Sequence, residues 1–341
     1  MHSNEQNSEP DRNQPVGLDI IIPMYNEEAV VDALMQTLLE VFSDSACRNS
    51  GIKSVHVIAV DDGSADATVP RLRAWMDRGV SMTILCLSRN FGQQNAFSAG
   101  MAHSRAQVCA LMDADLQDPP ALLLDMVRQW RAGQDIIYGR RMRRSAGLVK
   151  RMAYWSFYRI FNFLAEDKLP VDSGDFCLMD ARALAAINSL PEVVRFPRGL
   201  RSWVGFRQAA LPFDRPPRRS GSPKYTFRKL YNLAIDGFTS MSLRPLIAAR
   251  IMAAVMAAGC ALMLILMWGK RLLPGMLPDS NGGWTPLLLT VVLVALMAQL
   301  TGTYITGAYL SRAYIELKRR PPYIIARIFT SNDAAPDDNP Q

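Results

Sequence analysis

Residues 108–120 read VCALMDADLQDPP, a short apolar run that ends abruptly in two carboxylates, Asp113 and Asp115. Similar apolar runs, each followed by polar or glycine-bearing residues, occur at residues 18–22, 54–60, 82–87 and 135–138. Stretches of helical period separate these runs, and this alternation is typical of βαβ units around a parallel sheet. The sequence therefore predicts an α/β fold with a mostly parallel sheet.

Ligands of open α/β sheets bind outside the carboxyl ends of the strands, so the residues that follow each apolar run are the first candidates for a site. These residues are Pro23, Tyr25, Asn26 and Glu27; Asp61, Asp62, Gly63 and Ser64; Arg89 and Asn90; Asp113 and Asp115; and Arg140 and Arg141.

The D-x-D of Asp113 and Asp115 is the clearest metal-binding candidate. Two carboxylates two residues apart at a strand end can address one hard cation, and Gln117 adds a neutral oxygen nearby. Such a sparse set suits Mg²⁺ or Mn²⁺ that takes its other ligands from water and a diphosphate. The alternative is a solvated turn, since Asp clusters often form turns and caps.

Asp61 and Asp62 are neighbouring carboxylates that repel each other unless a base N–H, a ribose hydroxyl or the metal offsets their charge. Both are therefore candidates for substrate binding. Gly63 permits a tight turn, and Asp66 is positioned to cap the helix that follows.

Several other site types are not indicated. The sequence lacks GxGxxG after the first run and GxxxxGK[ST], and its three histidines form no nucleophilic set with Ser, Cys or Asp. Its five cysteines never form a CxxC pair, which argues against zinc and against a disulfide framework. The net charge of +7 suits an anionic membrane face or phosphorylated substrates and does not require nucleic acid.

Two long apolar runs, 246–268 and 286–310, predict membrane-spanning helices. The first, as a helix of roughly 34 Å, can cross a hydrocarbon core of about 30 Å. Basic residues before the first run and after the second favour both termini in the cytosol and the loop outside. Small and polar residues in the second run make a homo-oligomer, a dimer or a tetramer, plausible.

The segment 148–164 combines aromatic and basic side chains. That composition favours a helix in the headgroup layer, with an ordinary core helix as the alternative. Residues 1–17 are polar and lack the apolar region of a signal peptide, which favours a cytosolic first domain.

Six motifs together carry a resemblance to a known family. They are, in order, IPMYNEE (22–28), DDGSAD (61–66), SRNFGQQNAFSAG (88–100), MDADLQDPP (112–120), VDSGDFCLMD (171–180) and RRSGSPKY (218–225). The chain resembles, over roughly residues 18–329, the polyprenyl-phosphate glycosyltransferases of glycosyltransferase family 2, relatives of dolichol-phosphate mannose synthase. The resemblance implies a membrane-bound GT-A fold that moves one sugar from a nucleotide sugar to a polyprenyl phosphate, with inversion.

The resemblance also implies roles for individual residues. Asp61 matches the nucleobase contact; Pro23, Tyr25 and Glu27 match the nucleoside pocket; Asp113, Asp115 and Gln117 match the metal and diphosphate ligands; Arg141, Arg218 and Lys224 match the phosphate-binding cations; and Asp175 matches the acidic residue that faces the acceptor. Asp115 and Asp175 are thus the expected catalytic residues. Two positions depart from the family pattern: Cys177 stands where Arg is usual, and Pro223 where Ser or Thr is usual.

The expected chemistry agrees with the absence of a catalytic histidine. A lipid phosphate has its second pKa near 6 and is mostly dianionic at neutral pH, so it needs little help from a general base. The leaving nucleoside diphosphate does need neutralisation, which a divalent cation and the three basic residues can provide. Asp175 is then an orienting residue or a weak base.

The predicted organisation is a disordered tail (1–17), a cytosolic GT-A domain (18–226), a juxtamembrane helix (227–245), two spans (246–268 and 286–310) joined by an external loop (269–285), and a cytosolic C-terminal segment (311–341). We expect a multi-pass protein of a bacterial inner membrane, where undecaprenyl phosphate is the acceptor that the family implies. A processive polysaccharide synthase and a catalytically silent adaptor are the alternatives. The sugar, the nucleotide (UDP or GDP) and the glycan pathway, lipopolysaccharide or another surface glycan, stay open.

Overall fold

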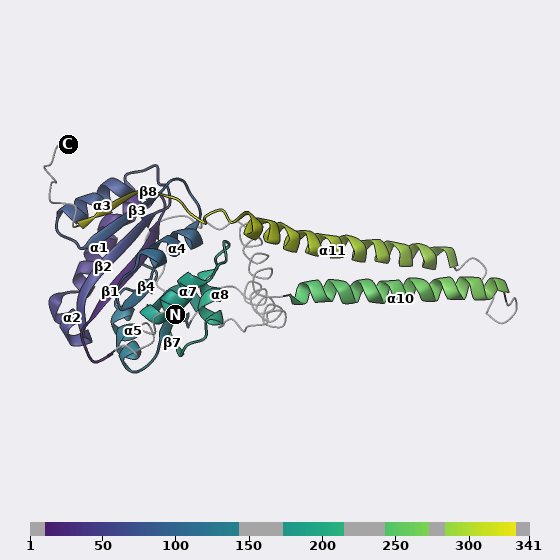
Figure 1. Cartoon of the computed structure of the whole chain (residues 1–341), viewed down its shortest axis with the longest axis horizontal. Coiled ribbons are helices and arrows are strands. Elements are labelled where there is room, and N and C mark those ends of the chain that lie inside the picture. Colours follow the sequence, from purple (N-terminus) through teal and green to yellow (C-terminus); the bar gives the residue numbers. More distant parts are fainter. Residues whose placement is uncertain (1–10, 143–172, 215–242, 273–283, 332–341) are drawn as a thin grey trace, which may run out of the picture. The chain divides into compact units, whose positions relative to one another are not determined.

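The computed structural model describes residues 11–142, 173–214, 243–272 and 284–331, which form two compact units. One unit holds an eight-stranded sheet with its helices, and the other holds two long helices (Figure 1). The predicted headgroup segment 148–164, the basic loop with Arg218, Pro223 and Lys224, and nearly all of 227–245 lie outside the described residues.

The sheet has the strand order β7-β5-β6-β4-β1-β2-β3-β8. Its strands are β1 (Val16–Met24), β2 (Ile52–Asp61), β3 (Met82–Leu87), β4 (Val108–Leu111), β5 (Ile136–Arg141), β6 (Ser173–Asp180), β7 (Gln208–Phe213) and β8 (Ile325–Thr330). The four consecutive strands β4-β1-β2-β3 are parallel, as are β5 and β7, whereas β6 and β8 run antiparallel to their neighbours. The five predicted strands and the α/β class are confirmed.

Helices cover both faces of the sheet. They are α1 (Glu28–Val41), α2 (Asp44–Ser50), α3 (Thr68–Asp77), α4 (Gln93–His103), α5 (Leu122–Arg131), α7 (Ala181–Ser189) and α8 (Pro197–Trp203). Side chains alternate between the faces of a strand, so Ile20 packs with α1, α3 and α5 in one core, and Ile21 packs with α4, α7 and α8 in the other. These two cores fix the positions of the strand ends and of the loops that follow them.

The first residues of the described chain are more ordered than the composition predicts. The side chain of Arg12 donates to the carbonyl oxygen of Gln134 at 2.7 Å, bonds the Asp135 carboxylate, and lies over the Trp130 ring. The polar composition predicted a disordered tail over residues 1–17. For residues 11–17 this prediction is wrong, because Arg12 is paired with a carboxylate far away in the sequence and β1 begins at Val16.

Three of the eight described strands, β6, β7 and β8, were not predicted from the sequence. The last of these is β8. It follows the second long helix and pairs antiparallel with β3, from Thr83 opposite Thr330 to Leu87 opposite Ile325. The run IARIFT is short and contains Arg327, so its pattern does not distinguish a strand from an irregular tail. Part of the predicted C-terminal segment 311–341 therefore belongs to the sheet.

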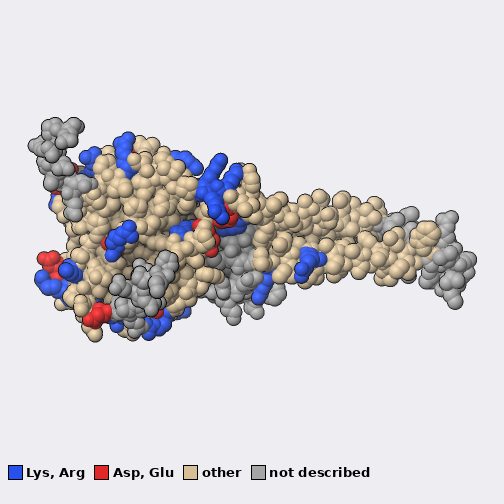
Figure 2. All heavy atoms as spheres, in the orientation of Figure 1, with Lys and Arg blue, Asp and Glu red and all other residues tan. Residues whose placement is uncertain are grey.

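The second unit contains α10 (Arg244–Leu272) and α11 (Trp284–Lys318), which lie side by side (Figure 1). Each holds a span long and apolar enough to cross a membrane, Arg244–Ile265 and Leu289–Lys318, and nearly all described side chains of these spans are at least partly exposed. Figure 2 shows few charged side chains along them. Helices that expose apolar side chains all round are stable in hydrocarbon rather than in water.

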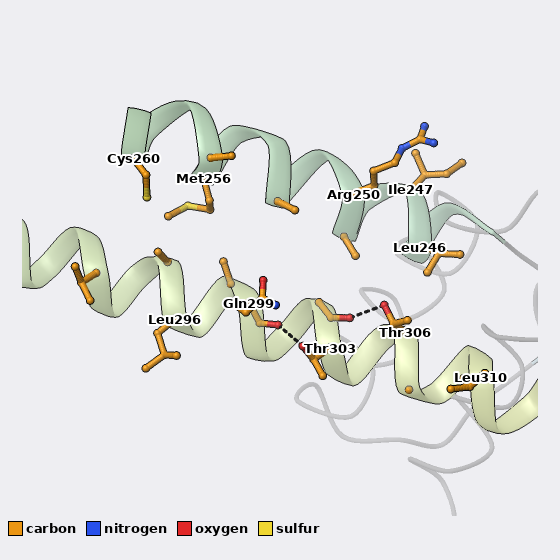
Figure 3. A pocket seen from close by; sticks show the side chains of 18 residues that line it. Leu246, Ile247, Arg250, Met256, Cys260, Leu296, Gln299, Thr303, Thr306 and Leu310 are labelled. Atoms are coloured by element: carbon orange, nitrogen blue, oxygen red, sulfur yellow. Dashed lines mark hydrogen bonds between the residues drawn. The ribbon is translucent and has the colours of Figure 1, made fainter. Parts of the chain in front are cut away.

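A groove of about 1130 Å³ runs between α10 and α11 (Figure 3). Small residues such as Ala253, Ala257 and Gly302 line it, so the two backbones can approach closely. The hydroxyls of Thr303 and Thr306 donate to backbone carbonyls one turn earlier, at 2.9 Å each. Their polar atoms are thus satisfied within the helix, as an apolar surrounding requires.

The pairing of β8 with β3 predicts a specific difference between two neighbouring side chains. Phe329 packs against the core, with the Arg73 guanidinium 4.7 Å above its ring, whereas Ile328 is 49% exposed. We expect Phe329→Ala to lower the free energy of unfolding by about 2 kcal/mol. Ile328→Ala is the matched control and should cost at most about 0.5 kcal/mol. Thermal unfolding in detergent measures both, and equal effects would argue against β8 as part of the sheet core.

Candidate functional site

The carboxyl ends of β1 and β2 are held together at one edge of the sheet. The two strands stay in parallel register up to Met24 opposite Asp61, and the Asp62 N–H then donates to the Met24 carbonyl oxygen at 2.8 Å. The chain leaves both strands at this point. The predicted nucleoside-pocket residues Pro23, Tyr25 and Glu27 therefore lie beside Asp61, with Tyr25 42% exposed.

The loops after β1 and β2 are joined by hydrogen bonds into one structure. Asn26 takes a left-handed backbone conformation (φ 52°), which Asn tolerates better than most residues. Its N–H donates to the Ser64 hydroxyl, and its side-chain oxygen accepts from the Ala65 N–H, both at 2.9 Å. The Glu27 N–H donates to the Thr68 hydroxyl at 2.9 Å. These bonds fix the backbone around the predicted nucleoside pocket.

Asp61 is a buried carboxylate with a local partner. Its two oxygens accept from the Ser64 N–H at 3.2 and 3.3 Å. Burial raises the pKa of Asp61, and the hydrogen bonds from Ser64 only partly oppose this effect. A carboxylate in this environment gains from any further N–H or O–H donor that a ligand brings.

Asp62 has a structural role of its own. One of its oxygens accepts from the Phe91 N–H at 2.7 Å and the other from the Gly92 N–H at 2.9 Å. Burial raises its pKa despite these two bonds. Asp62 thereby holds the loop that leads into α4, and its predicted contact with a substrate stays a prediction.

Gly63 completes the contact between the same two loops. It has φ +76°, and a Cβ at this position would lie 2.7 Å from the carbonyl carbon of Arg89 and 2.8 Å from the amide nitrogen of Asn90. The backbone of the loop after β3 thus packs directly onto Gly63, and only glycine fits there.

The D-x-D follows β4, the neighbour of β1 on its other side. The Met112 N–H donates to the Ile21 carbonyl oxygen at 3.1 Å, which holds the start of the motif against β1. An oxygen of Asp115 accepts from the Gln117 N–H at 3.1 Å, with Leu116 between them in a left-handed conformation (φ 55°). Such a conformation costs a non-glycine residue roughly 1–2 kcal/mol and is concentrated at functional sites.

Among the described residues, no group of three or more His, Cys, Asp or Glu side chains could hold a metal ion. The D-x-D supplies two carboxylates, and Gln117 an amide oxygen, all hard oxygen ligands of the type that Mg²⁺ and Mn²⁺ prefer. The donor set therefore fits a divalent cation but is incomplete, so a cation there needs further ligands from a substrate and water.

Asp175 lies on β6, next to β4 in the sheet. The register pairs Leu111 with Cys177, and its continuation places Asp175 level with Asp113. One oxygen of Asp175 accepts from Arg198 Nε of α8 at 3.3 Å, and the other from Gln94 Nε2 of α4 at 3.4 Å. The structure thus brings the predicted acceptor-facing carboxylate close to the predicted metal-binding motif.

Cys177, one of the two departures from the family pattern, lies beside Arg201. Cys177 is fully buried, and burial raises the pKa of its thiol, although the Arg201 guanidinium beside it acts in the opposite direction. Arg201 itself is 1% exposed and lies 5.0 Å from the centre of the Tyr138 ring. A guanidinium therefore occupies this region but comes from α8 instead of β6.

Of the three predicted phosphate-binding residues, Arg141, Arg218 and Lys224, the structure describes only the backbone of Arg141. Arg141 is the last residue of β5 and pairs with Phe213 of β7, which puts its backbone at the end of the sheet's other half. Arg218 and Lys224 lie outside the described residues. The sequence reading missed Gln93, Gln94 and Arg198 as site residues, although the two glutamines lie within the motif SRNFGQQNAFSAG.

The chain is similar in sequence to known proteins. Residues 19–187 match the model of "Glycosyl transferase family 2". An uncharacterised glycosyltransferase of Synechocystis is 42% identical over 68% of this chain and 71% of its own length. The chain belongs to glycosyltransferase family 2. It is a glycosyltransferase with a GT-A-like domain, as the motifs predicted.

One further relative and one solved structure each align with nearly the whole chain. A protein of Escherichia coli named "prophage bactoprenol glucosyl transferase homolog" is 31% identical over 91% of this chain and 99% of its own length. A solved mannosyltransferase of Pyrobaculum calidifontis is 18% identical, with a TM-score of 0.47, over 91% of this chain and 90% of its own. The E. coli relative matches this glycosyltransferase through the region of α10 and α11 as well as through the sheet.

Gly63 and Gly79 allow a matched pair of substitutions. Both have positive φ, but no atom of the described residues lies within 4 Å of a Cβ at Gly79. Gly79→Ala should therefore cost only the conformational term, about 1–2 kcal/mol. Gly63→Ala should cost clearly more and should also weaken nucleotide binding, since the loop after β3 must move. Unfolding and nucleotide-binding measurements on both variants test this, and equal losses of stability would contradict the close approach.

Asp61 and Asp62 should respond differently to removal of charge. Because burial raises the pKa of Asp61, its ionised form destabilises the fold at pH values above that pKa, and Asp61→Asn removes this penalty. We expect an unchanged or higher melting temperature at neutral pH, with weaker nucleotide binding. Asp62→Asn removes a similar penalty but leaves one backbone N–H without its acceptor, so it should give the lower melting temperature of the two variants. A lower melting temperature for Asp61→Asn than for Asp62→Asn would contradict these roles.

Proposed function

We propose that this glycosyltransferase moves a single sugar, with inversion, from a UDP- or GDP-sugar to a polyprenyl phosphate at the cytosolic face of a membrane. One observation supports the proposal: in a chain with two apolar helices, β4 and β6 are paired up to Leu111 opposite Cys177, and Asp113 and Asp175 each lie two residues beyond this pair on the two antiparallel strands. The name of the E. coli relative supports a polyprenyl acceptor.

The donor binds at the ends of β1, β2 and β4. Asp61 receives an N–H of the base, and Tyr25 and Glu27 border the nucleoside. Asp113, Asp115 and Gln117 would hold a divalent cation, Mg²⁺ or Mn²⁺, which would neutralise charge on the diphosphate and so make it a better leaving group. Arg141, together with Arg218 and Lys224, adds positive charge toward the phosphates.

The acceptor phosphate attacks the anomeric carbon from the side of β6. As a dianion it needs no proton removed, so Asp175 serves to orient it. In this step the acceptor phosphate, an anion, approaches the Asp175 carboxylate. Arg198, which is bonded to Asp175, reduces the repulsion between that carboxylate and the incoming phosphate.

A lipid acceptor accounts for the presence of two apolar helices in the same chain as the catalytic domain. A polyprenyl tail stays in the bilayer, so the enzyme must meet the phosphate at the headgroup layer. Helices α10 and α11 anchor it there, with both termini in the cytosol of a bacterial inner membrane. The small residues Gly302 and Gly307 on α11 fit close helix packing, and we include a homo-oligomer in the proposal.

A transfer assay tests the proposal directly. Membranes that contain the protein are incubated with a panel of labelled UDP- and GDP-sugars, and the lipid extract is analysed. We expect label from one donor in a lipid that releases the sugar on mild acid treatment. Label in a long polysaccharide would instead indicate a processive synthase, and no label from any donor would contradict the proposal.

Asp115→Ala should lower lipid glycosylation by at least about 100-fold, because it removes one of two carboxylates that hold the cation. Chelation of divalent ions in the wild-type enzyme should have the same effect, and added Mg²⁺ or Mn²⁺ should reverse it. Undiminished transfer in either experiment would contradict the proposed site.

Asp175→Asn preserves the shape of the side chain but removes its charge. We expect kcat to fall roughly 10- to 100-fold while nucleotide-sugar binding is unchanged, since the residue faces the acceptor. Full turnover in this variant would exclude Asp175 from the acceptor site.

A further inference from the structure

Two consecutive glutamines at the start of α4 contact two different site carboxylates. Gln93 Nε2 donates to an oxygen of Asp113 at 2.6 Å, and Gln94 Nε2 donates to an oxygen of Asp175 at 3.4 Å. Neighbouring residues on a helix point about 100° apart, so one helix start reaches the ends of both β4 and β6. The first turn of α4 thereby connects the metal-binding motif to the acceptor-facing carboxylate.

This helix start is held in place from several directions. The carboxylate of Asp62 accepts the N–H groups of Phe91 and Gly92, directly before α4. Asn95 donates to the Phe91 carbonyl oxygen at 2.9 Å. Farther along α4, Gly100 packs so closely on the Ile21 side chain that no Cβ fits between them. The two glutamines therefore project from a fixed support.

The amide is well suited to hold a carboxylate that must keep its charge. A lysine or arginine would neutralise Asp113 and compete with a cation, whereas an amide N–H donates a hydrogen bond without adding charge. The Gln94 amide has one possible orientation here, because its oxygen would repel Asp175. Its Oε1 is buried and accepts no hydrogen bond from the residues that the structure describes.

We propose that Gln93 and Gln94 are a positioning pair that sets the orientation of Asp113 toward the donor and of Asp175 toward the acceptor. The inference rests on the proposed function and adds a division of labour: Gln93 supports binding of the cation and the nucleoside diphosphate, and Gln94 supports use of the lipid phosphate. Neither residue touches the reacting atoms.

The test compares Gln93→Leu and Gln94→Leu, with Gln36→Leu as the matched control. Gln36 lies on the exposed side of α1, and its side chain donates to the Glu40 side chain at 3.2 Å. Two quantities are measured: the Kd of Mn²⁺ in the presence of nucleoside diphosphate, and the kinetic constants for polyprenyl phosphate at saturating donor. Thermal unfolding shows whether each variant is folded.

Loss of one such hydrogen bond corresponds to roughly a 3- to 10-fold effect. We expect Gln93→Leu to raise the Mn²⁺ Kd by this factor and to leave the KM for the lipid unchanged. Gln94→Leu should lower kcat/KM for the lipid by this factor and leave the Mn²⁺ Kd unchanged. Gln93→Lys should raise the Mn²⁺ Kd further, because its charge competes with the cation.

Two results would overturn the inference: both leucine variants with the same effect on both quantities, or both indistinguishable from Gln36→Leu. If the wild-type protein glycosylates no lipid, the proposed function fails instead. The Mn²⁺ measurement still decides the part of the inference that concerns Gln93, so the two failures are distinguishable.

Discussion

Repulsion between like charges at one edge of the sheet is the constraint on which the rest of the site depends. Strands β4, β1 and β2 are adjacent and parallel, so the carboxyl ends of β4 and β2 are two strand spacings, roughly 10 Å, apart. Asp113 and Asp115 follow β4 at the same edge at which Asp61 ends β2 and Asp62 follows it. Asp175 joins them from β6. Such a group of carboxylates is costly in a folded protein unless donors or cations compensate it, and burial adds a separate cost because it raises the pKa of both Asp61 and Asp62.

The protein compensates part of this charge with its own backbone and amide groups. Asp62 takes two N–H groups at the entrance of α4, Asp61 takes one from Ser64, and Asp113 takes the amide of Gln93. All these donors are neutral, so they orient the carboxylates and leave the negative charge in place. Negative potential at the D-x-D is what a divalent cation with a diphosphate requires, and this connects the local hydrogen bonds to the proposed transfer of a sugar.

Much of the fold could be predicted from the sequence because it rests on local patterns. The five apolar runs became strands, and the residues after β1, β2 and β4 came together because parallel strands end at a common edge. What the sequence did not reveal depends on contacts between distant residues. Strand β8 forms by pairing with β3. Arg12 is held by its hydrogen bond to the Asp135 carboxylate, and the guanidinium of Arg201 lies beside Cys177. Gln93 and Gln94 lay within a quoted motif, yet their partners on β4 and β6 became visible only in the structure.

The central claim is that the D-x-D holds a cation together with the diphosphate of a nucleotide sugar, because the described protein residues alone supply too few ligands. Electron paramagnetic resonance of free Mn²⁺ measures this most directly, in titrations with and without nucleoside diphosphate. The account predicts weak Mn²⁺ binding alone and at least about tenfold tighter binding with the nucleotide, with an equal reciprocal effect of Mn²⁺ on the nucleotide. Independent binding of the two ligands would contradict it.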